Sequence, residues 1–183
     1  LFKTAVDGID ALNDLADATG ASVENLSALE DAAKRTGTGV DVVGSALVKL
    51  NQVLAAAKPG SEQAAALQAI GLSAEDLRRL DPAEALLKVA QALSRFADDG
   101  GKARVVQELF GKSIREVAPL LKDLVEQGQL NATVTKAQAA EAERFNKELA
   151  NAKKNAEDLS RSIASARGMP ARWRSRYFTP AGD

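Results

Sequence analysis

Apolar residues recur every three or four positions along most of this chain, and no stretch alternates apolar and polar residues as a half-buried strand would. The first such pattern covers residues 2–19 and stops at Gly20. Ser22 can then cap a second helix, which should end in the Thr-Gly-Thr-Gly turn at 36–39. A third helix precedes Pro59. The expected inner faces are Leu26, Leu29 and Ala33 in the second helix, and Val43, Leu47, Leu50 and Leu54 in the third.

Shorter helices follow, each opened by a residue that can cap its first turn. Ser73 and Asp76 resemble a capping box. The stretch Asp-Pro-Ala-Glu at 81–84 is a stronger start signal, because proline suits the first helical position. The helix it opens should halt at 98–101, Asp-Asp-Gly-Gly. The chain is therefore predicted to be all-α, with residues 1–132 forming a bundle of short capped helices whose core includes Leu47, Leu50, Leu86, Leu93, Phe110, Leu121 and Leu124.

A Gly-Lys-Ser tripeptide in the stretch 108–121, ELFGKSIREVAPLL, invites a nucleotide-binding interpretation. A phosphate-binding loop needs a glycine five positions before the Gly of that tripeptide, and Val106 stands there. A corner between helices fits better. We expect Gly111 to end one helix, Ser113 and Glu116 to form a capping box for the next, and Pro119 to kink or restart it.

Residues 133–167 differ in kind from the bundle. Thr135 and Gln138 form a capping box, and a helix then runs without Gly or Pro to Arg167. Its apolar positions alternate steps of three and four, as in a heptad repeat, and charged or amide side chains cover the rest. The narrow stripe favours a coiled coil, or a long arm packed by a partner, over another bundle helix. The predicted self-association seam consists of Phe145, Leu149, Ala152, Ala156, Leu159 and Ile163.

Composition narrows the possible functions. Apolar residues make up 45% of the 183 residues, aromatics only 4%, and the formal net charge is −1, so no global charge indicates nucleic acid or membrane binding. The chain has no Cys and no His, which excludes disulfides, thiolate metal sites and the commonest general base. No catalytic, cofactor or metal site is predicted. The longest run without charged residues, 63–74, is too short to span a bilayer, and no secretory signal is visible.

The two ends of the chain differ from the rest of the sequence, and each leads to its own prediction. It opens with Leu1 in the middle of a helical pattern, which predicts a segment of a longer protein. After Gly168 the composition changes, and residues 168–183 hold the only Trp and Tyr, interleaved with arginines. Such a segment can bind nucleic acid, anionic lipid or an acidic groove. The absence of any period favours a disordered or non-native tail instead.

A series of short motifs resembles phage tail tape measure proteins over roughly residues 1–165. In order, these motifs are LNDLADATGASVENLS (12–27), AKRTGT (33–38), LDPAEAL (80–86), ELFGKS (108–113), VAPLLKDL (117–124) and AERFNKEL (142–149). None is specific alone. The Arg-rich end from Gly168 has no counterpart in the series.

This resemblance implies a structural protein, not an enzyme, of a long-tailed phage or prophage. Tape measure proteins lie extended inside the tail tube, where their length sets tail length, and several copies run in parallel. The implied partners are other copies in trimers or hexamers, the tail tube, the tail tip and the tail assembly chaperones. No specific nucleic acid is implied, and membrane contact only through other parts of a parent chain. The implied location is the lumen of the virion tail, after assembly in the host cytoplasm.

Two other classes of function remain open. Residues 70–80 resemble the entry to a DNA-binding or regulatory helix-turn-helix, with Gly71 in the turn and Arg78 and Arg79 on the next helix, although acidic neighbours neutralise that face. A lytic hydrolase would need a glutamate in an apolar cleft. Glu108, next to Leu109 and Phe110, is the nearest candidate, and a solvated helix position explains it more simply.

Overall fold

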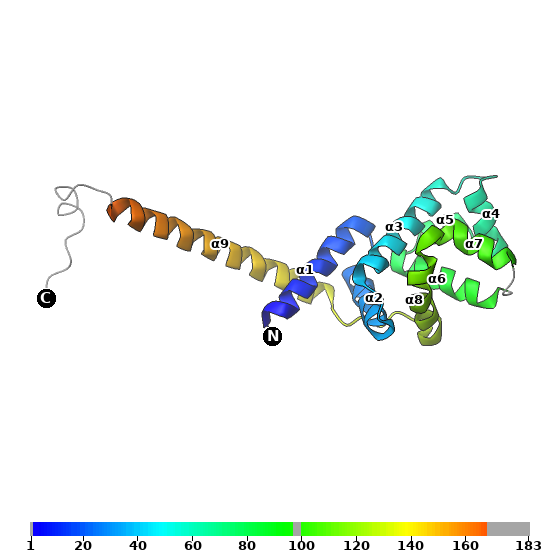
Figure 1. Cartoon of the computed structure of the whole chain (residues 1–183), viewed down its shortest axis with the longest axis horizontal. Coiled ribbons are helices and arrows are strands. Elements are labelled where there is room, and N and C mark those ends of the chain that lie inside the picture. The colour runs from blue at the N-terminus through cyan, green and yellow to red at the C-terminus, as the bar shows by residue number, and fades with distance from the viewer. Residues whose placement is uncertain (1, 97–99, 168–183) are drawn as a thin grey trace. The chain divides into compact units, whose positions relative to one another are not determined.

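The computed structural model describes residues 2–96 and 100–167, and within these ranges the chain forms helices joined by turns, with no strand (Figure 1). The all-α prediction is confirmed for this part of the chain. The helices are α1 (Phe2–Thr19), α2 (Val23–Thr36), α3 (Val40–Ala56), α4 (Glu62–Ala69), α5 (Ala74–Arg78), α6 (Pro82–Arg95), α7 (Gly100–Phe110), α8 (Ile114–Gln127) and α9 (Lys136–Arg167), with a 3-10 turn η1 (Gly111–Ser113) before α8.

The helix starts follow from the capping residues read in the sequence. The hydroxyl of Ser22 accepts from the Asn25 amide at 3.3 Å, and that of Ser73 accepts from the Glu75 amide at 3.2 Å. Asp81 accepts from the Ala83 amide at 2.8 Å. At the other end of α2, Gly37 adopts φ +70°, which glycine reaches at little cost, and its N–H donates back to carbonyls of the last turn. One boundary differs from expectation, because α7 begins at Gly100 within the predicted Asp-Asp-Gly-Gly break.

Helix α3 lies at the centre of the bundle, since it contacts α1, α2, α4, α5, α6, α7 and α8. Its stripe of Val43, Leu47, Leu50 and Leu54 is buried as predicted. Burying each such side chain stabilises the fold by about 1.5–3 kcal/mol. The predicted core is confirmed at all seven positions: Leu47, Leu50, Leu86, Leu93, Phe110, Leu121 and Leu124.

Polar contacts between distant segments fix how the helices pack. Arg35 on α2 reaches Asp123 on α8 through two hydrogen bonds, of which the Nη2–Oδ2 bond is 2.7 Å. The hydrogen bond to Asp123 is the main cause that raises the pKa of Arg35. Asp81 caps two helix starts at once, because its second carboxylate oxygen accepts from the Ser22 amide at 2.7 Å. These contacts tie the beginning of α2 to α6 and the end of α2 to α8.

Contacts divide the chain into two compact units, Leu1–Ala140 and Glu141–Asp183. The first unit holds α1 to α8 and the opening turn of α9. The described part of the second unit is the remainder of α9. The tail predicted at residues 168–183 lies outside the described residues, so the predicted three-part division stays a prediction.

Candidate self-association surface

The start of α9 is a capping box, as the sequence predicted. The Thr135 backbone N–H donates to Gln138 Oε1 at 2.9 Å, and the Gln138 N–H donates to Thr135 Oγ1 at 3.3 Å. Two amides that would lack an intrahelical partner are thereby satisfied reciprocally. The box determines the residue at which the long helix begins.

Residues of α2 anchor the segment that leads into α9, and sequence reasoning missed this contact. Ser27 is fully buried, and its hydroxyl accepts from the backbone N–H groups of Thr133 at 2.9 Å and Val134 at 3.0 Å. The same hydroxyl donates to the Glu24 carbonyl at 2.7 Å. The Glu24 carboxylate accepts from the Lys136 N–H, which adds a negative charge at the positive end of α9. The sequence feature that could have indicated this contact is a serine among the buried positions of α2.

The predicted seam lies on α9, and its large apolar side chains are exposed. The exposed fractions are 43% for Phe145, 51% for Leu149 and 62% for Leu159, the highest among large apolar residues of the described chain. Ala152 and Ala156, between the leucines, are also exposed. The backbone of Ile163 continues the helix, while its side chain lies outside the described residues. The structure therefore shows the long helix, and the coiled coil remains a proposal.

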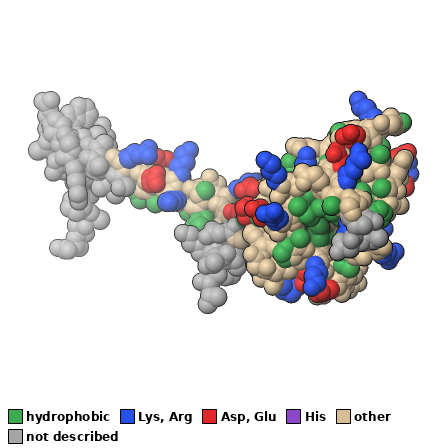
Figure 2. Space-filling view, turned by 45° about the vertical axis from the view of Figure 1, so that its right-hand side comes forward, with side chains coloured by type: hydrophobic (Ala, Val, Ile, Leu, Met, Phe, Trp, Pro, Cys, Tyr) green, Lys and Arg blue, Asp and Glu red, His purple; other side chains and the backbone are tan. Residues whose placement is uncertain are grey.

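Charged side chains surround the seam along the rest of α9. Figure 2 shows Lys, Arg, Asp and Glu along one side of this helix and apolar side chains along its lower edge. Glu143 and Lys147 form an ion pair at 2.5 Å, and Arg161 lies 3.7 Å from Glu157. The hydrogen bond from Lys147, followed by its positive charge, lowers the pKa of Glu143 below its ordinary value. Such i, i+4 pairs stabilise a helix by a few tenths of a kcal/mol each.

The helix corner is confirmed at one end and wrong at the other. Gly111, with φ +61°, follows the last residue of α7 as predicted. The capping box of Ser113 with Glu116 does not form, because Ser113 is itself helical in η1 and its side chain makes no capping bond. Pro119 does not restart the helix either, since α8 runs through it. The buried neighbours Val117 and Leu120 hold the turn that contains the proline.

Residues 70–80, which resemble a helix-turn-helix entry, contain the predicted turn, but Arg78 binds backbone carbonyls of the same chain. Gly71 adopts φ +76°, and the helix after it, α5, has five residues. Arg78 donates from Nη2 to the Ala57 carbonyl at 2.8 Å and from Nε to the Leu54 carbonyl at 2.9 Å. Arg79 pairs with Glu75 on the same helix. Arg78 thus satisfies carbonyls at the end of α3, a structural role that sequence alone did not reveal.

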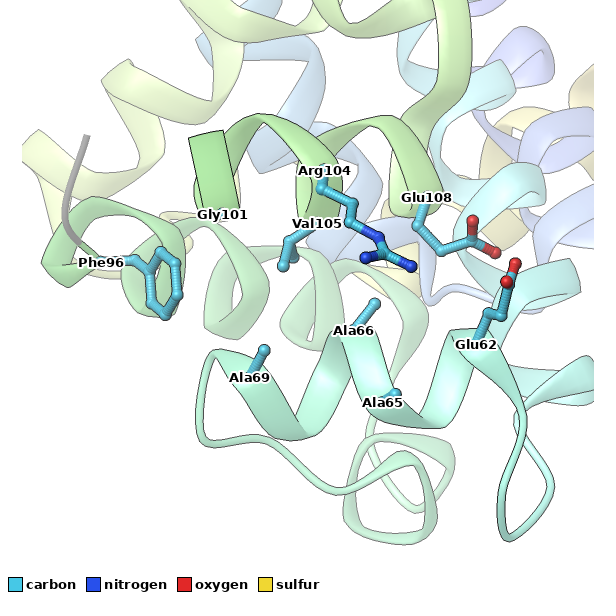
Figure 3. Close-up of a pocket in the computed structure, with 9 residues that line it drawn as sticks. All are labelled: Glu62, Ala65, Ala66, Ala69, Phe96, Gly101, Arg104, Val105 and Glu108. Atoms are coloured by element: carbon cyan, nitrogen blue, oxygen red, sulfur yellow. The ribbon is translucent and has the colours of Figure 1, made fainter. Parts of the chain in front are cut away.

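Glu108 lies at a cavity of about 330 Å³ between α4 and α7 (Figure 3). It accepts a 2.7 Å hydrogen bond from Gln63 Nε2, which links the two helices. Glu62 lines the same cavity, and in Figure 3 its carboxylate and that of Glu108 point toward one another, near Arg104. Three alanines with Phe96 and Val105 supply the apolar wall. The structure thus assigns Glu108 a contact between helices.

The described residues hold no metal cluster and no membrane-spanning helix. Within the described residues, no three acidic side chains are grouped so as to hold a metal ion. None of the described helices combines the length and the apolar character needed to cross a bilayer. No protein-family profile, curated protein or solved structure matches the chain. The exposed seam of α9 is the feature on which a function can be argued.

Proposed function

We propose that this chain is a structural segment of a phage tail tape measure protein, and that copies of it associate through the seam of α9. The observation that carries the proposal is the exposure of Leu149 and Leu159 on a helix with a strict three-four apolar period. A long helix exposing such a stripe to water gains free energy by packing it against another helix. Burial of each leucine would contribute about 1.5–3 kcal/mol.

The flanks of the seam favour parallel copies in register. With Leu149 at position a of the heptad, the g positions along the seam carry Glu141, Glu148, Asn155 and Ser162, and the e positions carry Asn146, Lys153 and Ser160. Parallel helices pair g with the following e of the partner, which places Glu148 opposite Lys153 of another copy. Antiparallel helices pair g with g and e with e, which gives no attraction because each flank carries charge of one sign. Ala152 and Ala156 allow the helices to approach closely.

A tape measure role suits this architecture. A helix converts sequence into distance at about 1.5 Å per residue, so α9 alone extends for about 48 Å. The motif series described above supports assignment to the tail of a long-tailed phage, with the tail tube and assembly chaperones as further partners. A role in the virion tail asks for no catalytic chemistry.

Sedimentation equilibrium tests the self-association. The full chain should sediment as an oligomer, and the double variant Leu149→Asp, Leu159→Asp should be monomeric and still helical, because it places charges in the seam. The matched control is Ala150→Asp, Asn151→Asp, which adds the same charge beside the seam and should remain oligomeric. A full chain that sediments as a monomer at every concentration would exclude association through α9.

Tail length tests the biological role separately. Duplicating residues 140–167, four heptads, in the phage or prophage that encodes the chain should lengthen its tails by about 42 Å. Averaged electron micrographs would measure the change, with synonymous recoding of the same codons as control. Unchanged tails together with an intact oligomer would reject the tape measure role and retain the coiled coil.

A further inference from the structure

An apolar groove of about 450 Å³ runs between α6, α7 and α8 in the first unit. Leu93 and Leu121 are its most deeply buried large side chains, and Val106, Ile114 and Val125 are half-buried along it. Figure 2 shows apolar side chains gathered on one face of this unit.

The outer face of α8 repeats the spacing of the α9 seam. Its groove residues Ile114, Ala118, Leu121 and Val125 are separated by steps of four, three and four. In α9, Phe145, Leu149, Ala152 and Ala156 have the same steps. Aligned in parallel, Phe145 lies over Ile114, Leu149 over Ala118, Ala152 over Leu121, and Ala156 over Val125. In the last three layers a small residue faces a larger one, the arrangement in which helix surfaces interlock.

The charges beside the groove also select the parallel orientation. Lys122 lines the groove, where it also lies 3.9 Å from Glu126 of its own helix, and Arg115 lies seven residues earlier on the same flank of α8. In the parallel alignment these basic residues take e positions, opposite Glu148 and Glu141 of the docked helix. In the antiparallel alignment the facing positions of α9 carry Asn146 and Lys153, which would be neutral or repulsive. On the α8 flank of the groove, opposite charges therefore meet in the parallel orientation only.

The parallel orientation identifies the occupant as a helix from a different copy. The connection between α8 and α9 covers residues 128–135, and a helix that returned across so short a link would run antiparallel to α8. A second copy has no such restriction.

We infer that the groove between α6, α7 and α8 is a docking site for residues 141–156 of α9 from a second copy, lying parallel to α8. The inference rests on the proposed self-association, since the docked helix uses the same seam. One α9 helix can make the groove contact or the coiled coil at a given moment, but not both. The contact is head-to-tail, so a bundle that accepts one arm can still offer its own.

Disulfide trapping tests the contact directly, because the chain has no cysteine of its own. Chains carrying Ala118→Cys and chains carrying Leu149→Cys are mixed under mild oxidation, and the products are separated by mass spectrometry. Both positions are exposed, so the fold tolerates them. We expect a mixed disulfide dimer well above the background given by Val48→Cys, an exposed position on α3, in place of Ala118→Cys. Homodimers of Leu149→Cys alone would overturn docking and leave the coiled coil standing, whereas no disulfide at all would overturn both.

Charge reversal tests the register. Adding Arg115→Glu and Lys122→Glu to the groove chain should lower the yield of the mixed dimer roughly fivefold, the effect expected from two exposed ion pairs. Adding Glu141→Lys and Glu148→Lys to the arm chain should then restore it. An unchanged yield after the first reversal would overturn the parallel register and the docking proposal with it.

Discussion

Ser27 lies between Leu26 and Ala28 on the buried face of α2, where a serine contributes little to apolar packing. Its hydroxyl is nevertheless fully used, with one donated and two accepted hydrogen bonds. Removing the oxygen takes the acceptor away from the Thr133 and Val134 amides, whose bonds to it are only partly buried. Thr133 is exposed, so water can replace part of what is lost, and the cost is close to that of the hydrogen bonds themselves.

We predict that Ser27→Ala lowers the free energy of unfolding by about 0.5–1.5 kcal/mol. The amides of Thr133 and Val134 should also exchange hydrogen faster than in the native chain. Urea denaturation measures the first effect and native-state hydrogen exchange the second. Ser94→Ala is the matched control, since Ser94 is exposed and bonds only to Gln91 in its own helix, so its effect should stay within about 0.5 kcal/mol.

At the scale of single elements, α8 shows how tertiary packing overrides local preference. Pro119 lies in its interior, where it removes one intrahelical hydrogen bond and crowds the preceding turn. Val117, Leu120, Leu121 and Leu124 are buried against the bundle and keep the helix continuous. The proline is therefore tolerated at a cost in stability.

Replacing Pro119 by alanine should raise the free energy of unfolding by about 1–3 kcal/mol, because the side chain is exposed and the missing N–H is restored. Thermal unfolding followed by circular dichroism measures the gain. The control is Pro82→Ala, at the first position of α6, where proline suits the helix and no gain is expected. A loss of stability in Pro119→Ala would show that packing around α8 requires the proline ring.

Ion pairing along α9 predicts a pH effect. The pKa of Glu143 is lowered by Lys147, so this pair stabilises the helix above the ordinary carboxyl pKa of 4.5 and loses that contribution as pH falls through the lowered value. Lys147→Ala should return the pKa of Glu143 toward 4.5. Carboxyl chemical shifts followed by NMR titration give both values. Identical titration curves in the two chains would mean that the ion pair does not persist in solution.

The elements that could be predicted from sequence are those determined by local chemistry. Ser22, Asp81 and Thr135 cap the helices they were expected to cap, and the α3 stripe is buried, because these signals depend on residues within one helical turn or one helix face. Ser113 could not be predicted in the same way. A Ser113 side chain that capped α8 would require a non-helical Ser113, whereas the residue belongs to the 3-10 turn that joins α7 to α8. The packing of these two helices favours the 3-10 turn.

Contacts between distant segments were beyond sequence reasoning for a related reason. Arg78 looked like a candidate for a DNA-binding face, yet it binds carbonyls 21 and 24 residues away. The seam of α9 was predicted because a heptad period is local, but its Ser27 and Glu24 anchor joins segments more than a hundred residues apart. No period or spacing reports such a pairing.

At the scale of the whole molecule, the two units differ in how their helices are stabilised. Those of the first unit share a buried core, whereas Phe145, Leu149 and Leu159 of α9 are exposed, and i, i+4 ion pairs lie along that helix. Single helices are marginally stable in water without packing. The stability of α9 should therefore depend on how many copies are present.

Hydrogen exchange at two protein concentrations should reveal this dependence. At low concentration the amides of residues 145–159 should exchange far faster than those of α3, and at high concentration they should become protected. The Leu149→Asp, Leu159→Asp variant should show the fast exchange at both concentrations. Protection that does not change with concentration would mean that the helix is stabilised within one chain.

The anchor at the start of α9 also determines where a mechanical load would enter the bundle. Tension applied along α9 meets the bonds from Lys136, Val134 and Thr133 to Glu24 and Ser27 before it reaches the connection to α8. The pull is therefore carried first by α2, which Arg35 joins to α8 and Asp81 joins to α6. While those bonds hold, tension does not reach the chain between Gly128 and Ala132. Stretching α9 therefore loads α2 and its contacts with α6 and α8 before it pulls α8 away from the bundle.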